Sequence, residues 1–188
     1  MKTRFLAAML ALAVVPFAAF AADEENPYKK VKVGDFATYK MAMKIGPLAI
    51  EGTMTQTVSA KDDKEATLKI ASKFNGMEIP AQDQKIDLTK PWDPTKTGTL
   101  PPGTEAKIEK LKDGEETIKV GGKEYKCKWE TYKTKLKVQG QEMEMEMKVW
   151  QSKDFNLNMV KTEMSGEVGG QKMETTIELT DSGAKKSD

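Results

Sequence analysis

The sequence contains no histidine and a single cysteine, Cys127. Without imidazole, a serine or cysteine triad that uses histidine as its base is excluded, as is a histidine-ligated zinc site. Because one thiol cannot form an intramolecular disulfide, stability must come from a packed core. Cys127 shares an apolar row with Tyr125 and Trp129, which is typical of a small core residue rather than of a nucleophile.

Other signals of catalysis or of nucleic-acid binding are also missing. The chain has neither a P-loop nor a dinucleotide-binding glycine pattern. Pairs of acids such as Asp62 with Asp63, or Asp87 with Asp93, are expected by chance among 29 acidic residues. The 30 basic residues nearly cancel these acids, and both signs are interspersed along the chain. The sequence therefore predicts no enzyme, no catalytic residue, no cofactor and no nucleic-acid partner.

Long apolar runs are absent except at the N-terminus. There a basic start precedes FLAAMLALAVVPFAAF, and the AFA segment at 19–21 suits a signal peptidase. About 16 apolar residues at ~1.5 Å each are too short for a ~30 Å hydrocarbon core, and Pro16 interrupts them. We therefore expect residues 1–21 to be a cleaved signal peptide. The product is predicted to be exported, periplasmic or extracellular, without stable membrane insertion.

Alternation of apolar and polar residues dominates the rest of the chain, and in an extended strand it sends successive side chains to opposite faces. Turn signals such as Gly46-Pro47, Asn75-Gly76 and Gly121-Gly122 separate the alternating segments. The only candidate for a helix lies at 104–116. We expect an all-β, mainly antiparallel fold: one strongly curved sheet of about nine strands, forming a half-barrel or open barrel. The strands are predicted around 35–45, 48–60, 68–74, 77–79, 117–120, 123–138, 141–150, 159–165 and 173–179.

The chain is predicted to form a single β domain, at 31–181, between a flexible lead-in at 22–30 and a disordered tail at 182–188. A proline-rich segment at 90–103 interrupts the strands and is interpreted as a long loop, because neither half has enough strands for its own core. In the segment at 123–138 the apolar residues change parity near Glu130, which predicts a β-bulge that bends the strand.

The segment QEMEMEMKVW, at 141–150, places methionine at every second position. The intervening glutamates would form the solvated face of a strand, so no further role is needed to explain them. Methionine itself is unexpected, because it lacks the β-branched or aromatic shape that packs best on a sheet. Thioethers do bind Cu(I), but same-face neighbours lie ~6.6–7 Å apart and the companion histidine is missing. The sequence therefore predicts no metal site.

Two interpretations of the methionine row remain. It is either ordinary core, with methionine filling irregular gaps, or the wall of an apolar groove that adapts to a flexible hydrophobic ligand. The sequence alone favours the first. A strongly bent sheet favours the second, because it tends to enclose space that must be filled.

The second half of the chain resembles known exported carriers. The stretch GKEYKCKWETYK is followed by KVWQSKDFNLNMVKTEM, in which a strand ends at Trp150, a polar turn follows, and the next strand carries Val160-Lys161 with Glu163. This layout resembles periplasmic lipoprotein carriers of the LolA, LolB and LppX type, and also a family of uncharacterised exported bacterial β-proteins that share G-K-E-Y-x-C-x-W. The resemblance implies a half-barrel whose covered concave face binds acyl chains. The only evident cover is the loop around Trp92.

From these observations we expect an exported, non-enzymatic protein that holds a lipid or a lipoprotein acyl chain on the concave face of its sheet. The alternative is a structural or protein-interaction module of the cell envelope, which would bind an envelope protein through sheet edges or the proline-rich loop. The residues expected to line the ligand site are Met41, Met43, Met54, Met143, Met145, Met147 and Trp150.

Overall fold

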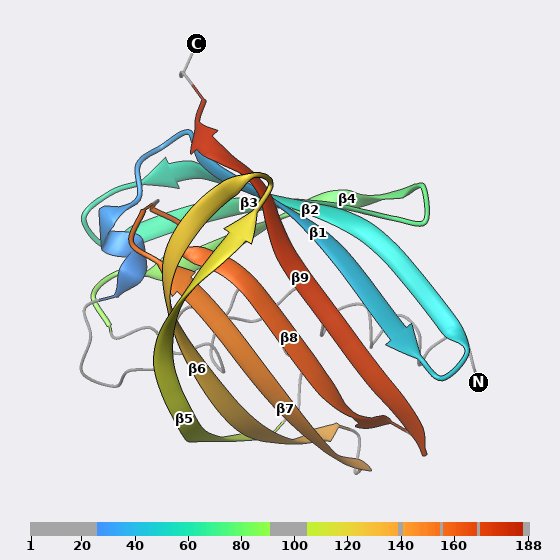
Figure 1. The fold of residues 1–188 in the computed structure, drawn as a ribbon. Coiled ribbons are helices and arrows are strands. Elements are labelled where there is room, and N and C mark those ends of the chain that lie inside the picture. The colour runs from blue at the N-terminus through green and yellow to red at the C-terminus, as the bar shows by residue number, and fades with distance from the viewer. Residues whose placement is uncertain (1–25, 91–104, 139–140, 155, 169, 186–188) are drawn as a thin grey trace.

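The computed structural model describes residues 26–90, 105–138, 141–154, 156–168 and 170–185. These residues form one short 3₁₀ helix and nine strands, and all nine strands belong to one antiparallel sheet that curves strongly without closing (Figure 1). The predicted fold class is therefore confirmed. The elements are η1 (Pro27–Lys30), β1 (Asp35–Ile45), β2 (Leu48–Lys61), β3 (Glu65–Phe74), β4 (Met77–Asp87), β5 (Glu105–Val120), β6 (Lys123–Val138), β7 (Gln141–Ser152), β8 (Met159–Val168) and β9 (Gln171–Ala184).

The strand order is β4-β3-β2-β1-β9-β8-β7-β6-β5, so the sheet consists of two meanders joined along β1 and β9. This central pairing begins with Asp35 opposite Ala184 and ends with Ile45 opposite Met173. β4 and β5 follow each other in sequence but form opposite edges of the sheet. Each meander is built from its own hairpins, and the hydrogen bonds between β1 and β9 join the two meanders into one sheet.

Two of the predicted turns show why the hairpins form where they do. Asn75 and Gly76 have φ angles of 46° and 85°, and Gly121 and Gly122 have φ angles of 57° and 84°. A two-residue turn with positive φ at both positions matches the right-handed twist of its flanking strands. The Asn-Gly and Gly-Gly pairs therefore determine the β3–β4 and β5–β6 hairpins.

The helix candidate at 104–116 is wrong, because residues 105–116 belong to β5. β5 pairs with β6 along its length, from Glu105 opposite Lys137 to Val120 opposite Lys123. Much of this edge strand is exposed, so it has no apolar face that would produce a clear alternation in sequence. Pairing across the sheet, rather than local propensity, determines its conformation.

The bulge predicted near Glu130 lies in the neighbouring strand. The register of β5 with β6 shifts between Lys110 and Lys112, whereas β6 pairs with β7 without a shift. The parity change in β6 has another cause. Cys127 is buried on the outer face of the sheet and Tyr132 is buried on the concave face, so one regular strand has buried apolar side chains on both of its faces.

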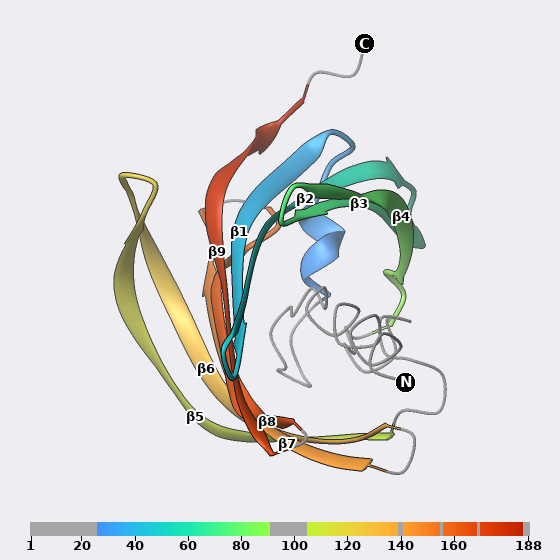
Figure 2. The same ribbon diagram turned by 90° about the vertical axis from the view of Figure 1, so that its right-hand side faces the viewer.

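The concave face carries most of the core, and η1 lies on this side of the sheet (Figure 2). Tyr28 of η1 is buried, and the Asn26 side chain donates hydrogen bonds of 3.1 Å to the carbonyl oxygens of Asp87 and Lys90. Asn26 and Tyr28 thus pack onto the domain, although they lie within the range predicted as a lead-in. β9 likewise runs to Ala184, into the predicted tail. The predicted signal peptide and loop residues 91–103 lie outside the described residues.

Candidate functional site

A continuous row of mainly apolar side chains crosses the concave face from β7 to β2. Met147 pairs with Met164, Met164 with Thr175, Thr175 with Met43, and Met43 with Ile50. Directly opposed residues of antiparallel neighbours project from the same face. The row therefore brings together methionines that are more than 100 positions apart in the chain.

Parallel rows flank this one at a spacing of ~6.6–7 Å, the distance between alternate residues of a strand. One neighbouring row contains Met145, Gly166, Met173 and Ile45, and the other contains Val149, Thr162, Ile177 and Met41. The methionines thus form a two-dimensional patch, which is called the methionine face below. It comprises Met41, Met43, Met54, Met145, Met147, Met164 and Met173, all of which are buried.

Glycines in these rows are covered by large neighbours. A Cβ atom at Gly166 would lie 2.7 Å from the carbonyl oxygen of Glu144 and 2.8 Å from Cγ of Met145. A Cβ atom at Gly52 would lie 2.5 Å from the carbonyl oxygen of Lys73 and 2.6 Å from Cδ1 of Phe74. Met145 therefore lies across Gly166, and the ring of Phe74 lies across Gly52. The methionine face owes its shape to the missing side chains as well as to the thioethers.

Five of the seven predicted site residues, namely Met41, Met43, Met54, Met145 and Met147, lie on this face. The backbone of Met143 pairs with Leu136, but its side chain lies outside the described residues. Trp150 must be corrected: it has the opposite parity from Met147 in a regular strand, so its side chain is on the outer face. The residues predicted from sequence to line the site did not include Met164 and Met173, although both belong to the apolar rows of their own strands. Only the β8–β9 and β9–β1 pairings show that they join the other methionines.

Near η1 the same face carries polar groups. Tyr39 is fully buried and Gln56 is 2% exposed, and neither the Tyr39 hydroxyl nor Nε2 of Gln56 has a hydrogen-bond partner. Burial, together with the neighbouring Tyr28, raises the pKa of Tyr39 well above its ordinary value. The phenol is therefore a neutral hydrogen-bond donor.

Toward the β5 edge, the concave face ends in a charged cluster around Glu130. Nζ of Lys110 lies 2.7 Å from Oε1 of this buried carboxylate, Lys128 lies 3.5 Å away, and the Tyr132 hydroxyl donates a hydrogen bond to Oε2. Burial alone would raise the pKa of Glu130, but the hydrogen bonds from Lys110 and Tyr132 outweigh it and hold the pKa below its usual value. The cluster is thus a satisfied, ionised boundary of the methionine face.

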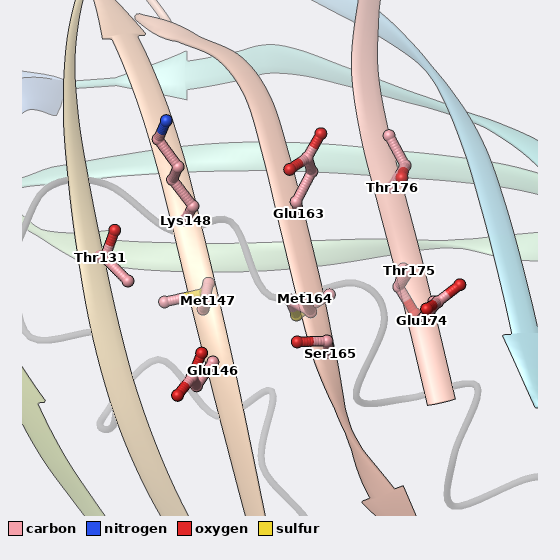
Figure 3. A pocket seen from close by; sticks show the side chains of 10 residues that line it. All are labelled: Thr131, Glu146, Met147, Lys148, Glu163, Met164, Ser165, Glu174, Thr175 and Thr176. Atoms are coloured by element: carbon pink, nitrogen blue, oxygen red, sulfur yellow. The ribbon is translucent and has the colours of Figure 1, made fainter. Parts of the chain in front are cut away.

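The outer face carries a groove of about 410 Å³ formed by β6, β7, β8 and β9 (Figure 3). Glu146, Lys148, Glu163 and Glu174 are among its lining residues. Glu163 pairs with Lys161 at 2.7 Å, and Glu174 pairs with Lys172 at 2.6 Å. The lining of the groove is therefore mixed, with these paired charges beside Met147 and Met164.

Trp150 belongs to an aromatic cluster on this outer face. Nζ of Lys148 lies 4.2 Å from the ring centroid of Trp129 and 4.3 Å from that of Trp150, and Nε1 of Trp150 donates a hydrogen bond to Glu116. Such cation–π contacts and the link to β5 hold the β5–β6 hairpin against β7. Cys127 is buried on the same face, and burial raises the pKa of its thiol to about 11.

Two further features of the described residues bear on function. No group of three or more Cys, Asp or Glu side chains among them is arranged to hold a metal ion. In the same part of the chain, no helix has the length and apolar character needed to cross a membrane.

No protein-family model matches the chain, and no curated protein matches it in sequence. Among solved structures, it is similar to a proposed exported protein with a YmcC-like fold from Bacteroides fragilis, with a TM-score of 0.48 and 10% identity over 81% of this chain and 96% of that one. A proposed lipoprotein from Parabacteroides distasonis has a TM-score of 0.48 and 9% identity over the same shares. The hypothetical lipoprotein YmcC from Escherichia coli has a TM-score of 0.33 and 7% identity, over 94% of this chain and 97% of that one. The three are described as exported proteins or lipoproteins, and none is described as of the LolA type.

Proposed function

We propose that this chain is an exported, non-enzymatic binding protein that holds a lipid or an acyl chain on the concave face of its sheet. The observation that carries the proposal is the methionine face, to which five adjacent strands, β2, β1, β9, β8 and β7, contribute seven methionines. Unbranched, polarisable thioether side chains adjust to flexible apolar ligands more readily than β-branched side chains do.

The single-layer architecture supports the same proposal. A sheet with one apolar face must bury that face against a second layer. Among the described elements only η1 lies on the concave side, near Tyr28 and Tyr39. At the far end of the face, Met145 and Met173 lie outside the contiguous apolar cluster that includes Met147 and Met164. An acyl chain along these rows would supply the apolar contacts of a second layer.

A non-enzymatic role fits the chemistry of the described residues. The sequence has no imidazole base, and the Cys127 thiol is buried with a raised pKa, which opposes thiolate formation. Glu130, the buried carboxylate, is engaged by Lys110 and Tyr132. The Cys127 thiol and the Glu130 carboxylate therefore stabilise the fold, because burial suppresses the reactivity of the first and hydrogen bonds engage the second.

The experiment is native mass spectrometry of the protein after export and mild purification, with lipid extraction of the same sample. The proposal expects a bound mass that disappears on delipidation and is recovered as lipid in the extract. A protein without lipid that captures a defined envelope protein would instead support the interaction module. The open edge strand β4, where Met77 is 73% exposed, is the feature that favours this second candidate.

A further inference from the structure

We propose that Tyr39 and Gln56 form a polar anchor that binds the uncharged carbonyl group of an acyl ester or amide, with the acyl chain lying along the methionine face. This inference rests on the proposed function and specifies its ligand class.

The anchor residues are buried polar groups without partners. Tyr39 has no exposed surface, Gln56 is 2% exposed, and neither the phenol oxygen nor Nε2 of Gln56 makes a hydrogen bond. Roughly nine in ten buried polar groups in proteins are hydrogen-bonded, because an unpaired one retains its full desolvation penalty. Two such groups close together on a candidate binding face indicate that a ligand supplies the missing partner.

The register places the two groups as neighbours. Tyr39 of β1 pairs with Met54 of β2, and Gln56 follows Met54 by two residues on the same face. Such diagonal neighbours lie ~7–8 Å apart at Cα, within reach of aromatic and long side chains. The phenol O–H and the amide N–H are both donors, and one carbonyl oxygen has the two lone pairs needed to accept from both.

The absence of a buried countercharge near Tyr39 among the described residues favours a neutral ligand group. η1 carries Lys29 and Lys30, but both are exposed to solvent. The lysines near Glu130 belong to β5 and β6, and β6 is four strands from β1, roughly 19 Å at ~4.8 Å per strand. Those lysines already pair with Glu130. An ionised carboxylate at Tyr39 would be buried without a cation, which is far more costly than burying a carbonyl group.

The rows beyond the anchor suit a long chain. From Tyr39 to Ile45, β1 extends over six residue steps, or roughly 20 Å. Along this length the rows of Met41, Met43 and Ile45 succeed one another on the same face. An acyl chain anchored at Tyr39 would therefore lie against apolar side chains up to the Met145–Met173 end of the sheet.

The test measures displacement of an apolar naphthylamine dye from delipidated full-chain protein by three probes: methyl palmitate, octadecane and ionised palmitate. Methyl palmitate and octadecane have the same chain length, and only the first has a carbonyl group. We expect wild-type protein to prefer the ester by about tenfold or more, and to bind it more tightly than palmitate. Tyr39→Phe and Gln56→Leu should each reduce the ester preference by about two- to tenfold and leave octadecane affinity unchanged.

Gln151→Leu is the matched control. Gln151 has the same parity as Met147 on β7, and its Nε2 also lacks a partner, but it is three strands away from Tyr39. This change should not alter the ester preference. In the ligand-free protein, Tyr39→Phe should hold or raise the melting temperature, by up to about 2–4 °C, because it removes an unpaired buried hydroxyl.

The outcomes separate the anchor from the proposed function. If no probe displaces the dye and no lipid co-purifies, the proposed function itself fails. Equal affinity for ester and octadecane leaves that function standing but overturns the anchor. Tighter binding of palmitate overturns the preference for a neutral group. An unchanged ester preference in Tyr39→Phe, with a lower melting temperature, shows that the hydroxyl serves the fold alone.

Discussion

The indole ring of Trp129 occupies the space that a side chain at Gly114 would need. The two residues are paired across β5 and β6, and a Cβ atom on Gly114 would lie 2.7 Å from Cζ2 and 2.9 Å from Cε2 of the ring. The other side of this cluster is formed by Lys148, whose Nζ lies over the same ring. The absence of a side chain at Gly114 thus allows the outer aromatic cluster to close against β5.

Gly114→Ala should lower the free energy of unfolding by about 1–3 kcal/mol, because the indole must move to admit the methyl group. In a Trp129→Leu background, the same change should cost less than about 0.5 kcal/mol, since its three closest contacts are all indole atoms. Urea unfolding of the four proteins in this double-mutant cycle measures the coupling. Additive effects would show that the close approach of Gly114 and Trp129 has no energetic consequence.

Met145→Glu should reduce uptake of a fluorescent fatty-acid ester by about 100-fold or more while the protein remains folded, because it introduces a charge at the end of the methionine face. Met145→Leu is the control that keeps the site apolar, and it should retain most of the uptake. Far-UV circular dichroism reports whether the sheet persists. If Met145→Glu simply unfolds the protein, Met145 is part of a solid core and the groove interpretation fails.

Glu130→Gln should lower the free energy of unfolding by about 1.5–3 kcal/mol, because it weakens charge-assisted hydrogen bonds to a buried carboxylate. The exposed pair of Lys133 with Glu144, 2.6 Å apart on the outer face, provides the comparison. Glu144→Gln should leave stability unchanged within error, since surface ion pairs contribute little. Chemical denaturation measures both variants, and equal effects would refute the special role of Glu130.

The same carboxylate predicts how stability depends on pH. In the folded protein the pKa of Glu130 lies below the ordinary value of 4.5. Its contribution to stability is therefore complete above that value and is lost as the pH falls through the folded pKa. Unfolding measured at successively lower pH should show a decline in wild-type protein that is shallower in Glu130→Gln. Parallel curves would exclude Glu130 as a source of the decline.

Cys127 should resist thiol reagents at mildly alkaline pH until the protein unfolds, because burial raises the pKa of its thiol to about 11. An ordinary thiol ionises near 9.0. Between these two pKa values the folded protein keeps the thiol proton that the unfolded chain loses. The free energy of unfolding should therefore fall as the pH rises above about 9. Labelling with and without urea measures the protection. Rapid labelling of the folded protein would contradict it.

Much of the fold could be predicted from alternation and turns alone. The positions of Met41, Met43 and Met147 on one face of their strands follow from the period of two in an extended chain. The turns at Asn75-Gly76 and Gly121-Gly122 follow from residues that adopt positive φ readily. Both signals are local, so a few consecutive residues are enough to predict the face of a side chain or the position of a turn. Local patterns failed at 104–116, because an exposed edge strand takes its conformation from its partner.

The sequence by itself determined that the chain forms antiparallel hairpins and that its methionines occupy single faces of separate strands, because alternation and tight turns arise within a few consecutive residues. Only the tertiary structure decided that β1 pairs with β9, which joins Met43 to Met164 through Thr175. It also showed that Tyr39 and Gln56 are buried without partners and that Trp150 faces outward. These relationships depend on register and burial between segments far apart in the chain, which no local pattern specifies.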